Sequence, residues 1–246
     1  PEYNMRKWYW DMEWITDDPN EGDAITCIVV YDNYDDKYIV YTWNPYLNED
    51  KFPEYNNNSV IFTFHSEFEM LRGFMKQIQE CDPDMLISWF GSKFDLPKLI
   101  HRLDFRGIDP RGLSPYNELK GAEFGKITDK VDNYSQVEQP IRGRITLDLD
   151  LAFERQWNDS QRGTLPSLAL DYVSETVLGA KKLVSEKFPD KNEFFKRGWL
   201  EDTENYLEYA RVDVELLYRI DEEMALSEGI LALQRLIIAP FDACFY

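Results

Sequence analysis

The chain has 246 residues, of which 43% are hydrophobic and 15% aromatic, and its formal net charge is −19. These values are typical of a folded globular protein with a sizeable core, and the charge argues against a protein that holds nucleic acid through a broad basic face. No apolar run is long enough for a membrane span, no signal peptide opens the chain, and the three cysteines form no CxxC pair, so we expect a reducing intracellular compartment, no disulfide scaffold and no zinc site.

The N-terminal part of the chain predicts an antiparallel sheet. Three stretches rich in aromatic and β-branched residues follow one another, and a short polar turn separates the second from the third. Strands joined by such short connections are typical of an antiparallel meander. The three predicted strands span Lys7–Ile15, Ala24–Tyr31 and Lys37–Trp43.

The next part of the chain predicts a helix, a strand and a second helix. Ser66 followed by Glu69 forms a capping box, which marks the start of a helix. A short apolar run after Asp82-Pro83-Asp84 predicts a buried strand. The first helix should have an apolar face at Phe68, Leu71, Met75 and Ile78, the strand should span Met85–Phe90, and the second helix should run from about Leu96 to Leu103.

The second half of the chain begins irregularly and then returns to periodic patterns. Residues 105–143 contain several prolines and glycines without sustained periodicity, so we predict an insertion of loops, with a hairpin as an option. Strands followed by helices and further strands indicate a mixed α/β sheet with helices packed on it. A half-buried strand is predicted from the alternation of Ile145, Leu147, Leu149 and Leu151, and helices from Leu165 to Leu178, before Gly179, and from about Glu201 to Leu226.

Two carboxylates share one face of the first predicted strand. Because side chains alternate along a strand, Asp11 and Glu13 point the same way, opposite to the tryptophans around them. Buried together, the two groups would repel each other and lose their hydration, and a divalent cation would remove that penalty. The alternative is an edge strand with an acidic, solvent-facing side.

A third carboxylate interrupts the apolar face of the last long helix. Asp213 falls in the middle of a stripe that runs at helical spacing from Tyr206 to Met224, and Tyr209 lies one turn before it. An unpaired carboxylate in that position would be strongly destabilising, so the pattern indicates a site rather than ordinary core. The alternative is a buried ion pair with an arginine such as Arg211, which projects from a different face of the helix.

A fourth carboxylate, Asp95, lies between the predicted buried strand and the second helix. On its own it is explained as the N-cap of that helix, with Pro97 in the first turn. Taken together with Asp11, Glu13 and Asp213, it belongs to a set of four carboxylates that could all be aimed at one point.

Three segments resemble the exonuclease motifs of the DnaQ-like nucleases, in the form found in family B DNA polymerases. Asp11-Met12-Glu13 resembles the first motif, the stretch from Asp82 through Trp89 to Asp95-Leu96-Pro97 the second, and Tyr209 with Asp213 the third. The order and the rough spacing agree with that family, and the similarity covers nearly the whole chain. One departure is Phe90, which stands where the family usually has Asn. We expect this change to affect how the terminal nucleotides are held, and the activity to survive.

The resemblance implies an RNase H-like (DnaQ-like exonuclease) α/β fold, with a mixed central β-sheet and helices packed on it. It implies that residues 1–246 form a single 3′→5′ exonuclease domain with the insertion at about 105–143. The domain would come from a longer protein, whose covalently linked polymerase domain is absent from this chain. The first residue, which is Pro rather than Met, agrees with a fragment. We find no polymerase motif in the chain and expect no membrane partner.

The resemblance also implies a chemistry. Asp11, Glu13, Asp95 and Asp213 would bind two ions, Mg²⁺ or Mn²⁺, which prefer oxygen ligands. One ion would activate a water and the other would stabilise the leaving 3′ oxygen. Tyr209 would hydrogen-bond the attacking water. The substrate would be the 3′ end of single-stranded DNA, and the products nucleoside 5′-monophosphates released during proofreading.

Three aromatic residues are candidates for substrate binding, because aromatic rings stack on bases of any sequence. They are Trp89, Phe90 and Phe94, and for the first two the alternative is a place in the core. Two other functions stay open: a free-standing exonuclease for DNA or RNA, not linked to replication, and a catalytically inactive structural domain of a polymerase. The intact carboxylates and Tyr209 argue against the second.

Overall fold

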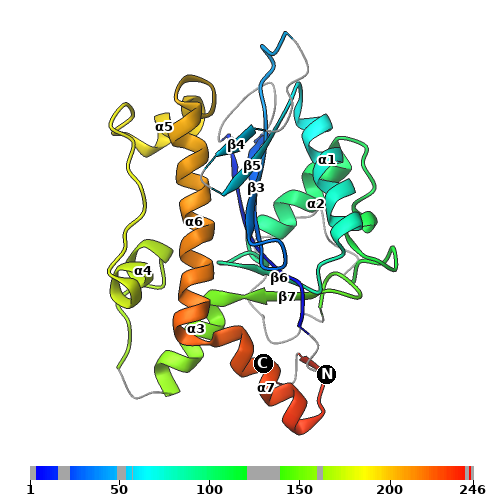
Figure 1. Ribbon diagram of the computed structural model, residues 1–246, viewed down its shortest axis with the longest axis vertical. Coiled ribbons are helices and arrows are strands. Elements are labelled where there is room, and N and C mark those ends of the chain that lie inside the picture. Colours follow the sequence, from blue (N-terminus) through cyan, green and yellow to red (C-terminus); the bar gives the residue numbers. More distant parts are fainter. Residues whose placement is uncertain are drawn as a thin grey trace.

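In the computed structural model, one mixed sheet of seven strands lies between two groups of helices (Figure 1). The structure describes residues 4–15, 23–48, 54–56, 58–120, 139–159, 163–241 and 244. The strand order across the sheet is β4-β5-β3-β2-β1-β6-β7. The strands are β1 Lys7–Trp14, β2 Ile25–Asp32, β3 Lys37–Trp43, β4 Glu54–Asn56, β5 Ser59–Phe64, β6 Met85–Ser88 and β7 Ile145–Asp148.

The centre of the sheet is the part that positions the carboxylates. β1, β2 and β3 form the predicted antiparallel meander, and β1 also pairs with β6 in parallel. β1 is therefore an inner strand, and the edge-strand alternative for Asp11 and Glu13 is wrong. Every residue of β2 is buried, because helices cover the sheet on both faces.

Helix α6 packs along one face of the sheet, against β1 and β2, while α1 and α2 cover the other face (Figure 1). The alternation along β1 decides which side chains meet which helix. Trp8 packs against Phe74 of α1, whereas Tyr9 contacts Tyr218 of α6. The helices are α1 Glu67–Cys81, α2 Asp95–Phe105, α3 Leu149–Asp159, α4 Leu170–Leu178, α5 Lys191–Glu201, α6 Thr203–Met224 and α7 Leu226–Ile237, with a 3₁₀ turn at Pro110–Leu113.

Helix α1 begins as predicted, and three of the four residues of its expected apolar face are buried: Leu71, Met75 and Ile78. The Ser66 hydroxyl accepts the Glu69 N–H at 3.3 Å, as in a capping box. Phe68, however, is 39% exposed, so its predicted place on the apolar face is wrong. The buried residue of this turn is Glu67, which accepts the Ile25 N–H at 2.8 Å and pairs with Arg102 of α2. This buried ion pair holds α1, α2 and the sheet together.

The predicted strand at residues 145–151 is too long by three residues. β7 ends at Asp148, which pairs with the last residue of β6, Ser88. Beyond Asp148 the chain therefore has no neighbouring strand, among the described residues, to pair with. Leu149 and Leu151 belong to α3 instead, where only Leu149 is fully buried. The predicted helix from Leu165 likewise starts later, at Leu170. Helices α3, α5 and α7 and the strands β4 and β5 were not predicted from the sequence.

The structure describes two parts of the predicted insertion at 105–143, on either side of residues 121–138. Besides the 3₁₀ turn the insertion contains an antiparallel bridge between Leu119 and Ile141, where the Lys120 N–H donates to the Pro140 carbonyl at 2.8 Å. These residues flank 121–138, which lie outside the described residues. The hairpin, and the assignment of the whole chain to one domain, stay predictions.

Candidate active site

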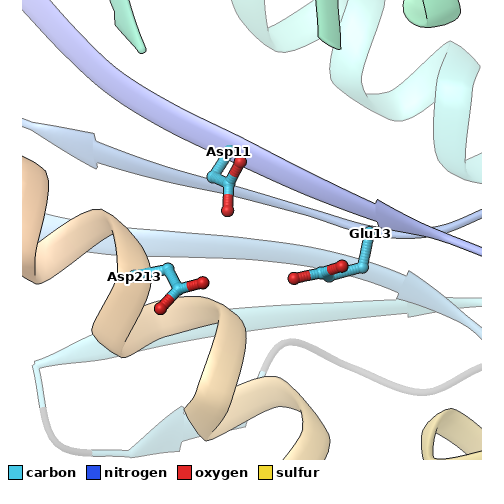
Figure 2. A group of neighbouring side chains, drawn as sticks. All are labelled: Asp11, Glu13 and Asp213. Atoms are coloured by element: carbon cyan, nitrogen blue, oxygen red, sulfur yellow. The ribbon is translucent and has the colours of Figure 1, made fainter. Parts of the chain in front are cut away.

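Three carboxylates from two elements converge on one point (Figure 2). β1 carries Asp11 and Glu13 on the face that meets α6, and α6 brings Asp213 to the same place. One oxygen of each group lies within 4.8 Å of the oxygens of the other two. Asp213 is buried, whereas Asp11 and Glu13 are partly exposed, so water and small ions have access to the group. The structure thus brings these three predicted residues together.

The proximity of the carboxylates makes their ionisation costly. Partial removal from water and the charge of Asp213 raise the pKa of Asp11 to about 7, although Lys182 opposes the rise. Burial, followed by the charges of Asp11 and Asp213, raises the pKa of Glu13 well above its ordinary value. Such a cluster retains protons at neutral pH unless a cation compensates its charge.

The donor set fits a divalent metal ion. Among the described residues, the buried Oδ1 atom of Asp213 has no hydrogen-bond partner, which is costly for a carboxylate oxygen. Its other oxygen accepts from Lys182 Nζ at 2.5 Å. Carboxylate oxygens alone are the ligands that Mg²⁺ and Mn²⁺ prefer, and an ion at the centre of the group would satisfy the unpaired oxygen.

Lys182 is the residue of this site that the sequence did not reveal. It lies in the irregular stretch between α4 and α5, and its Nζ is 5.5 Å from the centre of the Tyr209 ring. Burial lowers the pKa of Lys182, but Asp213 and Tyr209 outweigh that effect and raise it above the ordinary value, so the ammonium is charged. The alternative partner Arg211 is wrong, because Arg211 pairs with Glu208 and Glu215 of its own helix and lies over the Tyr38 ring of β3.

Tyr209 lies one helical turn before Asp213, as the spacing predicted. Its ring is buried and contacts Phe194 and Phe195 of α5 edge-on. Burial and the charge of Asp213 raise the pKa of Tyr209 above its usual range, so the phenol keeps its proton at neutral pH. The residue thus presents a hydrogen-bond donor beside the carboxylates.

Asp95 lies near Asp11 and Glu13, but it is not one of the three carboxylates whose oxygens lie within 4.8 Å of one another. It is 5% exposed and is the first residue of α2; the N-cap is Phe94, so the N-cap explanation of Asp95 is wrong. Burial, then the charges of Asp11 and Asp148, raises the pKa of Asp95 well above its ordinary value, and Asp95 in turn contributes to the raised pKa of Glu13. The structure therefore brings Asp95 into electrostatic contact with the two carboxylates of β1.

The three aromatic candidates have different surroundings. Trp89 is buried, donates from Nε1 to the Leu168 carbonyl at 2.8 Å and packs against Phe153, so it is part of the core. Phe90 is partly buried with a φ of 55°. Phe94 is 49% exposed, and its ring meets that of Phe90 edge-on at 6.4 Å. Phe94 is the ring most accessible to a base.

Comparison with known proteins assigns the chain to a family. Residues 5–173, well over half of the chain, match the family described as "DNA polymerase family B, exonuclease domain". The chain belongs to this family of exonuclease domains. The match includes Asp11, Glu13 and Asp95 and ends before Lys182, Tyr209 and Asp213. The predicted family and the RNase H-like α/β fold are confirmed.

The relatives of this exonuclease domain are DNA polymerases several times its length. It is 32% identical over 178 residues to a DNA polymerase of Pyrococcus glycovorans, covering 71% of this chain and 20% of the polymerase. It is 26% identical over 186 residues to the DNA polymerase of Autographa californica nuclear polyhedrosis virus, covering 71% and 18%. The chain thus spans a fifth of these relatives or less. Within the described residues, no helix has the length and apolar character needed to cross a bilayer.

Proposed function

We propose that this exonuclease domain hydrolyses the terminal phosphodiester at the 3′ end of single-stranded DNA and releases nucleoside 5′-monophosphates, as the proofreading part of a DNA polymerase. The observation that carries the proposal is the convergence of Asp11, Glu13 and Asp213, with a buried oxygen of Asp213 left unpaired among the described residues. The family match and the names of the relatives support the polymerase context.

The carboxylates are proposed to hold Mg²⁺ or Mn²⁺, with Asp95 completing the set. When ionised, Asp11, Glu13, Asp95 and Asp213 carry four negative charges, which two divalent cations balance. Such ions supply a nucleophilic water at neutral pH and neutralise the charge that develops on the phosphate and the leaving oxygen. Binding requires deprotonated ligands, so affinity should rise as pH increases through the raised pKa of Asp11, about 7.

Glu13 and two further groups of the chain, Tyr209 and Lys182, are proposed to orient the reactants. The protonated phenol of Tyr209 donates a hydrogen bond to the attacking water, and Glu13 accepts another from it. The water loses a proton to solvent as its oxygen forms a bond to phosphorus, the bond from phosphorus to the 3′ oxygen breaks, and that oxygen takes up a proton from solvent. The ammonium of Lys182, held by Asp213, compensates the negative charge of the terminal phosphate.

The acidic surface is compatible with this substrate because only a few nucleotides enter the site. The exposed ring of Phe94, with Phe90 beside it, is proposed to stack on a terminal base, since base stacking on aromatic rings is independent of sequence. We propose that a linked polymerase domain contributes most of the affinity for duplex DNA, since the relatives are full DNA polymerases.

The test is degradation of a 5′-labelled single-stranded DNA with Mg²⁺, with Mn²⁺ and with EDTA. A ladder that shortens from the 3′ end in either metal, and disappears with EDTA and in the double variant Asp11→Ala/Glu13→Ala, supports the proposal. The matched control is Asp104→Asn, an exposed carboxylate of α2, which should leave the ladder unchanged. Immediate release of labelled mononucleotide would show the opposite direction, and no cleavage by folded protein in either metal would refute the activity of this chain.

A further inference from the structure

Two buried carboxylates outside the proposed ligand set hold the loop between β6 and α2. Asp148 ends β7 and Asp150 lies in the first turn of α3, and they are 2% and 1% exposed. Neither has an ion-pair partner among the described residues. Buried carboxylates without a cation are expensive to place, so a compensating interaction is expected.

That interaction is with the backbone of the loop. The Ser92 N–H donates to Asp148 Oδ1 at 2.9 Å, and the Phe90 N–H donates to Asp150 Oδ1 at 2.9 Å. Two carboxylates from the junction of β7 and α3 therefore accept hydrogen bonds from two backbone amides, Phe90 and Ser92, of the segment that connects β6 to Asp95.

The same segment has an unusual conformation that needs such support. Phe90 has a φ of 55°, which a bulky residue adopts only at an energetic cost. Its carbonyl accepts the N–H groups of both Lys93 and Phe94 at 3.0 Å. A Cβ on Gly91 would lie 1.7 Å from the Ser88 hydroxyl oxygen, so that backbone passes as close to the strand as glycine permits. The loop is thus tightly wound, and Asp95 follows it directly.

The burial of Asp148 and Asp150 close to each other is electrostatically unfavourable and lowers the stability of the fold. Burial and the neighbouring Asp148 raise the pKa of Asp150 to about 7. The backbone amides of the loop are the partners that compensate this cost.

We propose that Asp148 and Asp150 are positioning residues, which fix Asp95 against Asp11 and Glu13 by anchoring the backbone amides of Ser92 and Phe90. The inference rests on the proposed function, in which Asp95 is a metal ligand. The competing explanation is purely structural, since Asp150 lies in the first turn of α3, where a carboxylate stabilises the start of a helix. A structural role would affect the stability of the domain and leave its metal affinity unchanged.

The experiment measures Mn²⁺ affinity without DNA, by titration followed with electron paramagnetic resonance, together with amide hydrogen exchange of residues 89–95. Asp148→Ala and Asp150→Ala remove the acceptors, whereas Asp148→Asn and Asp150→Asn keep an oxygen in place. The matched control is Asp221→Ala, which removes another buried carboxylate, one that accepts the Ser227 N–H and the Tyr9 hydroxyl where α6 meets α7. Should the Ala variants fail to fold, Asp148→Ser and Asp150→Ser, too short to reach the amides, replace them.

The positioning role predicts that the Ala or Ser variants weaken Mn²⁺ binding about 10- to 100-fold, as loss of a group that orients a metal ligand does elsewhere. The Asn variants should bind nearly as wild type, and Asp221→Ala should melt earlier with unchanged Mn²⁺ affinity. Wild-type affinity in the Ala variants, or an equal loss in Asp221→Ala, would overturn the proposal. If wild type itself bound no Mn²⁺, the proposed function would fail. In that case, faster hydrogen exchange of the 90–94 amides in the Ala variants than in wild type would still support the anchoring of the loop.

Discussion

Replacing Asp11 by Asn should stabilise the metal-free protein while abolishing its proposed activity. In the folded chain the pKa of Asp11 is raised from 3.8 to about 7, by partial removal from water and by Asp213. The folded state therefore binds a proton more tightly than the unfolded state, and the protein loses stability as pH rises from about 4 to about 7. Asn cannot ionise, so the variant is spared this loss.

The magnitude follows from the size of the pKa rise. A rise from 3.8 to about 7 corresponds to about 4 kcal/mol once the carboxyl is ionised. Because Asp11 is partly exposed and solvent screens its charge, we expect a smaller gain of about 1–2 kcal/mol at pH 8. For a domain of this size that gain raises Tm by about 2–8 °C. At pH 4 the carboxyl is protonated in the folded protein, and the gain should vanish.

The assay is thermal and urea unfolding at pH 4 and pH 8, in EDTA and in Mn²⁺. In Mn²⁺ at 100 times its Kd, the free energy of unfolding of wild type should rise by about 2.7 kcal/mol by mass action. Wild type should then be more stable than Asp11→Asn, the reverse of their order in EDTA. Asp104→Asn is the control for removal of an exposed charge and should change neither result. The reasoning is refuted if Asp11→Asn is destabilising at pH 8 in EDTA, or if its gain is the same in Mn²⁺.

Three further substitutions test other parts of the site. Lys182→Ala leaves Asp213 without its ion-pair partner and should lower the free energy of unfolding at pH 8 by about 3 kcal/mol, measured in urea with EDTA; a loss below about 0.5 kcal/mol would show that the pair is not buried in solution. Gly91→Ala forces a Cβ against Ser88 and should cost about 1–3 kcal/mol in the same assay and slow nuclease activity, whereas unchanged values would show that the loop relaxes easily. Phe90→Asn should be about 1 kcal/mol more stable than Phe90→Ala, because Asn tolerates a positive φ, and equal stabilities would argue against strain at this position.

The sequence by itself determined the meander of β1, β2 and β3 and the faces of their elements on which Asp11, Glu13 and Asp213 lie. Alternation along β1 showed that Asp11 and Glu13 share a face, and helical spacing placed Asp213 on the buried side of α6, one turn after Tyr209. Both conclusions rest on local periodicity, which depends only on residues close in the chain. Capping at Ser66 was predictable for the same reason.

Other boundaries depended on contacts that no local pattern records. The alternation at Leu147, Leu149 and Leu151 fitted a strand, but β7 stops where its partner β6 stops, and the chain turns into α3. Phe68 had the spacing of a core residue, yet Glu67 took the buried position because Arg102 of α2 is there to pair with it. In both cases the partner comes from a distant segment.

Only the tertiary structure decided what surrounds the carboxylates. Lys182 reaches Asp213 across 31 residues from an irregular stretch without periodicity, and Asp148 and Asp150 reach the loop before Asp95 from more than 50 residues away. Their partners are a single carboxylate and backbone amides, which leave no pattern in the sequence. Periodicity shows which way a side chain points within its own element, and the packing of the elements decides what it meets there.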